Sequence, residues 1–280
     1  MKRFILSLAA TLALASPTFA TWSVVAVDRD TGQIVVASAT CLPQAVFPQL
    51  GATGLKDVQA IIIPGVGAAA AQARIDVSRR AQNLVAQEIK KGTPPDEIIR
   101  KLKETDASMH DQRQYGIVDL QGRTAGFSGL QNGHVSLDQQ GRVAGTQIYF
   151  SIQGNILATK EVIESAVRSF TDTKGTLADR VMAAMDAADA NGGDSRCNCD
   201  VLPKAVAPCE TRTALVAYII VCNPTDIASK GLKDGTYALE LSVTDQNTLS
   251  TENGNPVKTL RLRYDTWREF QRAKASQPTH

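Results

Sequence analysis

The sequence has almost no net charge, and beyond its first residues it has no long apolar run. Its 30 Lys and Arg and 28 Asp and Glu residues give a formal charge of +2. Without Lys2 and Arg3, which lie in an N-terminal leader, 28 basic side chains balance the 28 acidic ones. Nucleic acids and acidic membranes bind clustered positive charge, so neither is indicated as a partner. No second apolar run could span a membrane once the leader is removed.

Histidine is also scarce, with three residues in the chain. His280 is terminal, His110 lies in a polar linker and His134 lies in a loop region. A Ser–His–Asp type of site needs a histidine beside its nucleophile, whereas an isolated loop histidine is more often solvated. The sequence therefore gives little support for a histidine-based triad.

Cysteine is sparse but informative about compartment. The five residues are Cys41, Cys197, Cys199, Cys209 and Cys222. In an oxidising compartment they predict one or two disulfides, and the odd number leaves a thiol free or paired between chains. Cys197 and Cys199 are too close along the chain to pair easily, so Cys209 is expected to bond to one of them. The Cys-x-Cys spacing without a nearby histidine argues against zinc, and no metal is predicted. Cys41 as a nucleophile also lacks a neighbouring histidine, so a disulfide is the favoured interpretation.

Residues 1–20 have the pattern of a secretory signal peptide. Lys2 and Arg3 give a basic start, 4–15 is apolar, and Thr18-Phe19-Ala20 places small residues three and one before a cut. The apolar run is short for a membrane anchor. Cleavage after Ala15 would leave Ser16-Pro17, whereas cleavage after Ala20 leaves Thr21. We therefore expect a periplasmic or secreted protein that begins at Thr21.

The apolar pattern after Thr21 alternates between strands and pairs of helices. Residues 21–40 form two apolar runs around a polar turn, which predicts a β-hairpin. Further strands are predicted at 58–63, 66–72, 114–119, 124–129, 147–152 and 214–221, with a final hairpin of 237–243 and 257–264. Helical periodicity is found at 75–89, 94–102, 162–170 and 177–188.

This order predicts one α+β domain over 21–270, followed by a polar tail at 271–280. Each helix pair can cover one outer face of two stacked, mainly antiparallel sheets. The expected architecture is therefore a four-layer α/β/β/α sandwich.

Several short segments resemble a known family. They are 21–28 (TWSVVAVD), 65–72 with Gln72 at its end, 114–119 followed by Gly122-Arg123, 153–157 (QGNIL) and 192–196 (GGDSR). Together with the strand that begins in threonine, they resemble the family called domain of unknown function 1028, within the N-terminal-nucleophile (Ntn) hydrolases. The stretches 41–56 and 197–209 depart from the usual family pattern.

The Ntn resemblance implies that Thr21 is a nucleophile whose own α-amine acts as the base, with no cofactor. For the oxyanion, Asn155 is one candidate donor and Gln72 a second. Asp194 either orients the amine or pairs with Arg196. Ser38 is a further catalytic candidate, and Ser23 and Thr40 are expected to lie close to Thr21 on the hairpin. Lys56 is expected to be a surface residue.

Two functions remain open at this stage. The first is an exported hydrolase that cleaves an amide or related acyl bond in a small-molecule or peptide-like substrate. The second is a non-catalytic exported binding or envelope-associated protein on the same scaffold. A homodimer is compatible with such a sandwich, and the sequence leaves the oligomeric state open.

Overall fold

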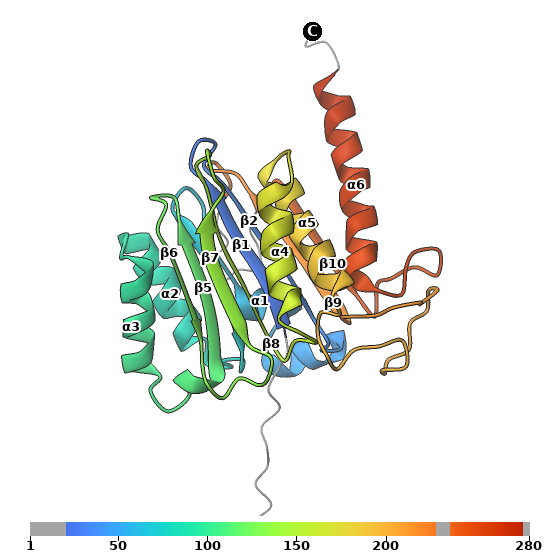
Figure 1. The fold of residues 1–280 in the computed structure, drawn as a ribbon, viewed down its shortest axis with the longest axis horizontal. Coiled ribbons are helices and arrows are strands. Elements are labelled where there is room, and N and C mark those ends of the chain that lie inside the picture. The colour runs from blue at the N-terminus through green and yellow to red at the C-terminus, as the bar shows by residue number, and fades with distance from the viewer. Residues whose placement is uncertain (1–20, 228–235, 277–280) are drawn as a thin grey trace, which may run out of the picture.

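The fold is taken from a computed structural model, which describes residues 21–227 and 236–276. The expected signal peptide and residues 277–280 lie outside the described residues. Two antiparallel sheets are stacked face to face, with α2 (Arg80–Lys91) and α3 (Pro95–Thr105) covering one side (Figure 1). The other side is covered by α4 (Glu161–Asp172), α5 (Leu177–Ala190) and α6 (Pro256–Ala275). This is the expected α/β/β/α sandwich, with one extra helix.

The larger sheet has six strands, and the strand that starts at Thr21 is near its centre. In spatial order they are β10 (Leu239–Thr244), β9 (Val216–Cys222), β2 (Gln33–Thr40), β1 (Thr21–Asp28), β8 (Ile148–Asn155) and β7 (Leu137–Arg142). The smaller sheet contains β3 (Ala60–Ile63), β4 (Gly67–Ala73), β5 (Arg113–Asp119) and β6 (Thr124–Ser128). Three short helical turns, η1 (Gln44–Leu50), α1 (Leu55–Gln59) and η2 (His110–Gln112), occupy the connections.

Alternation along β1 determines which side chains face each layer. Trp22, Val24 and Ala26 pack in the apolar cluster beneath α4 and α5, whereas Val25 and Val27 pack between the two sheets. Because side chains alternate along a strand, Thr21 shares the inter-sheet face with Val25 and Val27. The inter-sheet layer is therefore apolar along most of β1 and polar at the end that begins with Thr21.

One predicted element at the C-terminal end is wrong. Residues 257–264 are not a strand of a final hairpin but the first turns of α6, and β10 instead pairs with β9. Asn255 caps this helix and Pro256 takes its first position, which is a recognised helix start. Val257, Leu260 and Tyr264 are fully buried at helical spacing. The helix also continues to Ala275, beyond the expected domain end at residue 270.

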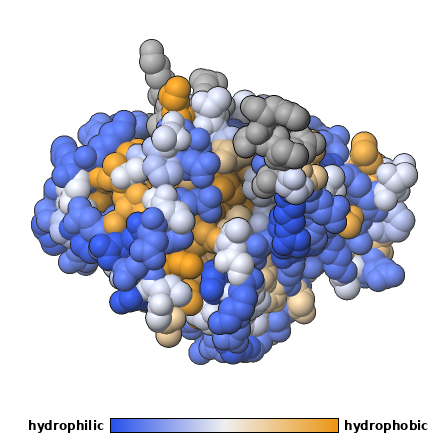
Figure 2. All heavy atoms as spheres, turned by 90° about the horizontal axis from the view of Figure 1, so that it is seen from above, coloured by the Kyte–Doolittle hydropathy of each residue, from blue (hydrophilic) through white to orange (hydrophobic). Residues whose placement is uncertain are grey.

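One strand, β7, was missed because its sequence, LDQQGR, is polar and contains glycine. It lies at the sheet edge and is stabilised by pairing with β8 rather than by its own β propensity. The surface seen in Figure 2 is mostly hydrophilic, with separate apolar patches. In the described part of the chain, no helix has the length and apolar run that a membrane crossing requires.

Candidate functional site

Thr21 is held between two neighbouring strands at the polar end of the inter-sheet layer. It lies opposite Thr40 of β2 and opposite Asn155 of β8. Its Oγ1 donates to Thr40 Oγ1 at 3.3 Å, and the residue is only 3% exposed. The structure therefore brings the predicted residues Thr21, Thr40 and Asn155 together, although they are far apart in the sequence.

Gln72 connects Thr21 to the opposite sheet. Its Nε2 donates to the Thr21 carbonyl oxygen at 3.0 Å and to Gln114 Oε1 at 2.7 Å. Its Oε1 accepts from Ser23 Oγ at 2.6 Å and Gln59 Nε2 at 2.7 Å. A primary amide has two hydrogens, and the bonds to Thr21 and Gln114 use both of them. The geometry favours positioning of Thr21 over the oxyanion role predicted for Gln72.

A wider network of buried amides surrounds this contact, and sequence reasoning missed most of it. Gln153 Nε2 donates to Ser23 Oγ at 2.6 Å, and Gln59 Oε1 accepts from Tyr218 Oη at 2.9 Å. Gln114 Nε2 donates to the carbonyl oxygen of Gly154 at 2.8 Å. A usable signal existed in the repeated polar side chains at every second position of β8, namely Ser151, Gln153 and Asn155. Buried polar groups require partners, so such a row predicts a polar layer.

Trp22 fixes the backbone beside Thr21 from the helix-facing side. The carbonyl oxygen of Trp22 accepts from Ser38 Oγ at 2.6 Å, so Ser38 positions the strand end. Gly193 has φ of +48°, and a Cβ there would lie 2.6 Å from Trp22 Cη2. A Cβ on Gly154 would lie 3.1 Å from Trp22 Cβ. The Trp22 side chain therefore fits closely because neither glycine has a side chain, with Gly193 against the indole and Gly154 against Cβ.

Asp194 anchors the end of β2. Its carboxylate accepts from the backbone N–H of Cys41 at 2.9 Å and pairs with Arg196, with Nη2 to Oδ2 at 2.8 Å. Asp194 is fully buried. These contacts correspond to the ion-pair alternative for Asp194, and they hold the backbone of Cys41, the residue after Thr40.

Four of the five cysteines form two disulfides. Cys199 bonds to Cys209, which confirms that Cys209 pairs with one of the two closely spaced cysteines. Cys41 bonds to Cys197 and ties the end of β2 to the segment after Asp194. Cys222 is a buried free thiol. Its burial, and to a smaller extent the nearby Asp226, raise its pKa to about 12. Within the described residues, no group of three His, Cys, Asp or Glu side chains is arranged to hold a metal.

An open pocket adjoins Asn155 on the side of β8. It has a volume of about 470 Å³ and is formed by the connection between β6 and β7, with Asn132 and His134 among its lining residues. Asn155 Nδ2 donates to the carbonyl oxygen of Asn132 at 2.9 Å. The pocket wall is thus one hydrogen bond from the residue paired with Thr21.

The remaining candidates lie elsewhere. His110 is buried and stacks on Phe127 with 3.9 Å between ring centroids, and desolvation lowers its pKa. Lys56, expected at the surface, has a side chain only 12% exposed and pairs with Glu240 at 2.9 Å. Neither contact involves Thr21.

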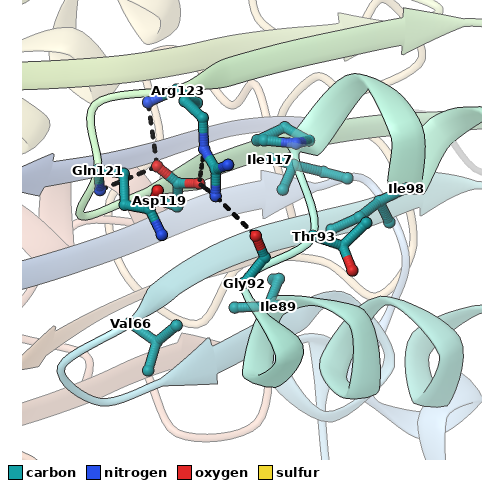
Figure 3. Close-up of a pocket in the computed structure, with 10 residues that line it drawn as sticks. Val66, Ile89, Gly92, Thr93, Ile98, Ile117, Asp119, Gln121 and Arg123 are labelled. Carbon is teal, nitrogen blue, oxygen red and sulfur yellow. Dashed lines mark hydrogen bonds and ion pairs between the residues drawn. The ribbon is translucent and has the colours of Figure 1, made fainter.

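Arg123, which lies in one of the segments that resemble the family, belongs to a structural clamp at the far end of β5 (Figure 3). Asp119 accepts from the backbone N–H of Gln121 and Arg123, each at 3.0 Å, and from Arg123 Nε at 2.7 Å. Arg123 Nη2 then donates to the Gly92 carbonyl oxygen at 3.0 Å. These bonds connect the β5–β6 turn to the end of α2, and the cavity beside them is only about 10 Å³.

The fold and site define a four-layer α/β/β/α sandwich whose central strand begins with a threonine. The chain belongs to the family described as "Family of unknown function (DUF1028)", whose model matches residues 21–201. A crystal structure of protein SPO2555 from Silicibacter pomeroyi, also described by that family model, has the same fold, with a TM-score of 0.60 and 20% identity. The match covers 88% of this chain and 85% of that protein. A comparison with curated proteins finds no match.

Proposed function

We propose that this chain is exported, cleaved after Ala20, and then hydrolyses an amide or related acyl bond with Thr21 as the nucleophile. The observation that carries the proposal is the placement of Thr21. It is the first residue of a central strand, with its hydroxyl at the polar end of the inter-sheet layer and Asn155 opposite. The family match also begins at residue 21, so the leader lies outside it.

Cleavage after Ala20 would supply the base for this reaction. In the full chain the nitrogen of Thr21 is part of a peptide bond and cannot accept a proton usefully. A free α-amine has a pKa of about 7.7–8.0, close to neutral pH, and it is attached to the same Cα as the nucleophile's side chain. The N-terminal pattern and the two disulfides support an exported, periplasmic or secreted protein.

The proposed reaction has two halves. Thr21 Oγ attacks the substrate carbonyl carbon while its proton passes to the α-amine, directly or through water. The tetrahedral intermediate collapses, the C–N bond breaks, and the leaving amine takes that proton. Water then attacks the resulting Thr21 ester, with the α-amine again as base, and releases the acid and the free hydroxyl.

We assign the oxyanion donor to Asn155. It lies opposite Thr21 at the end of β8, and its side-chain amide is a neutral hydrogen-bond donor. Removing one oxyanion donor typically lowers the rate by about 10²–10³-fold. Asn155→Ala should therefore retain the free Thr21 amine but react far more slowly.

The test is the intact mass of the exported protein before and after treatment with a simple β-lactone. The expected result is a chain that begins at Thr21 and gains one adduct, located on Thr21 by peptide mapping. Thr21→Ala should gain none. A second form with two extra residues before Thr21 keeps the hydroxyl but blocks the amine, and it should also be inert.

Contrary results would favour the non-catalytic alternative. A mature chain that begins elsewhere, or that begins at Thr21 and does not react, removes the nucleophile. If the extended form functions as well as the native form, the free amine has no role and a binding protein is the better interpretation.

A further inference from the structure

The connection between β6 and β7 forms an open pocket, and its wall residue Asn132 bonds to Asn155, which lies opposite Thr21. Its volume of about 470 Å³ lies in the range of small-molecule sites. Side chains that line it include Ser128, Leu130, Gln131, Asn132, His134 and Ser136. The pocket is distinct from the small cavity in Figure 3, which is closed by an ion pair at the other end of β5.

Most side chains of the lining are polar, and none carries a carboxylate, ammonium or guanidinium group. Hydroxyls and side-chain amides can donate and accept hydrogen bonds, so they match an uncharged polar group. An ionised group would lose part of its hydration in such a pocket without gaining a countercharge. His134, which also lines the pocket, is exposed to solvent.

Both walls of the pocket are connected to Thr21. On one side, the carbonyl oxygen of Asn132 accepts from Asn155, which lies opposite Thr21 in the sheet. The Cα atoms of such opposite residues are about 4.5–5.5 Å apart. On the other side, Gln114 Nε2 donates to Ser128 Oγ at 2.7 Å and lies 3.3 Å from Ser136 Oγ. Gln114 also accepts from Gln72, the residue that holds the Thr21 carbonyl. The pocket wall is therefore connected to Thr21 through Asn155 on one side and through Gln114 and Gln72 on the other.

We propose that this pocket is the subsite for an uncharged, hydrogen-bonding part of the substrate, such as a carboxamide or hydroxyl-bearing group. This proposal rests on the proposed function, because it assumes that Thr21 reacts. Leu130, which is 93% exposed, lies at the rim and offers an apolar contact for the linking carbons. The selected substrates are then neutral polar acyl compounds rather than acidic or basic ones.

Matched β-lactones test the proposal on the mature protein. Four compounds share one ring and carry a methyl, carboxamide, carboxylate or ammonium arm of similar length. Thr21 Oγ attacks the ring carbonyl, the acyl C–O bond of the ring breaks, and the released oxygen takes the proton held by the α-amine. The adduct therefore adds the full mass of the lactone, and its rate of formation is followed by intact mass.

The carboxamide arm should react with Thr21 about 10-fold faster than either charged arm, after correction for the intrinsic reactivity of each lactone with a free threonine amide. Gln131→Glu places a carboxylate on the exposed wall without changing its shape. It should raise the ammonium rate and lower the carboxylate rate, each by about 3-fold. Gln121→Glu makes the same change at the opposite end of β5 and should leave all rates unchanged.

The outcomes separate the two proposals. If the methyl lactone gives no adduct, Thr21 is not an activated nucleophile and both proposals fail. If it reacts but the arms are equal, or a charged arm is fastest, the nucleophile stands and the neutral subsite is wrong. If Gln131→Glu changes no arm relative to Gln121→Glu, the arms do not enter this pocket, and the subsite is again overturned.

Discussion

The side-chain amide of Gln72 donates a hydrogen bond to the carbonyl oxygen of Thr21 at 3.0 Å. Gln72 is on β4 in the smaller sheet, and Thr21 begins β1 in the larger one. The bond therefore fixes the first residue of β1 from the opposite layer.

Replacing Gln72 by Leu should destabilise the protein and slow reaction at Thr21 without removing the hydroxyl. Gln72→Leu takes partners from Ser23, Gln59 and Gln114, all of which are buried. We expect the free energy of unfolding to fall by about 2–4 kcal/mol, because buried polar groups lose their partners. Urea unfolding measures this change. The exposed Gln121→Leu is the control, and an equal loss in both variants would contradict the role of the network.

Gly193→Ala should disturb Trp22 and thereby the strand end at Thr21. The added Cβ meets the indole at 2.6 Å, and φ is +48°. We expect a loss of about 1–3 kcal/mol from overpacking and strain. Gly145→Ala is the matched control, since Gly145 has φ of +74° but no heavy atom within 4 Å of the new Cβ. Comparable losses at both positions would show that backbone strain alone, and not contact with Trp22, explains the effect.

The two disulfides should differ in their contribution to stability. Cys41–Cys197 closes a sequence separation of 156 residues, whereas Cys199–Cys209 closes 10. The entropy lost by the unfolded chain grows with loop length, so Cys41→Ser with Cys197→Ser should cost about 2–5 kcal/mol, and more than the other pair. Urea unfolding of the two double mutants tests the order. Removing the long-range disulfide should also slow acylation of Thr21, because Cys41 follows Thr40. An unchanged rate would show that this disulfide contributes only to stability.

Glu88 should make the free energy of unfolding depend on pH in the acidic range. It is buried, and hydrogen bonds from Lys101, Lys91 and Thr93 lower its pKa from 4.5 to about 2. Because the folded pKa is lowered, this stabilisation is present above pH 4.5 and is lost as pH falls towards 2. Glu88→Gln should therefore be less stable than wild type at pH 6, and the difference should shrink by pH 2.5. Glu104→Gln, at an exposed position on α3, should show no such convergence in urea unfolding measured at both pH values.

Local sequence patterns predicted most of the fold. The hairpin of β1 and β2, the pairs α2–α3 and α4–α5, and the stacked layers all follow from apolar periodicity and turn residues. The failures have local causes as well. The apolar residues at 257–264 suggested a strand, although Asn255 and Pro256 begin a helix there. In β7 the polar sequence gave no sign of a strand, which is stabilised by its pairing with β8.

Local sequence is enough to predict the alternation that puts Thr21 on one face of β1 and the order of elements that builds two sheets. The residues that surround Thr21 depend on tertiary packing. Asn155, Thr40 and Gln72 meet Thr21 through strand register and sheet stacking, and the pocket at Asn132 follows from the same packing. These contacts join distant segments, so no local pattern encodes them. They depend on which strands become neighbours, and the burial of the whole apolar layer determines that.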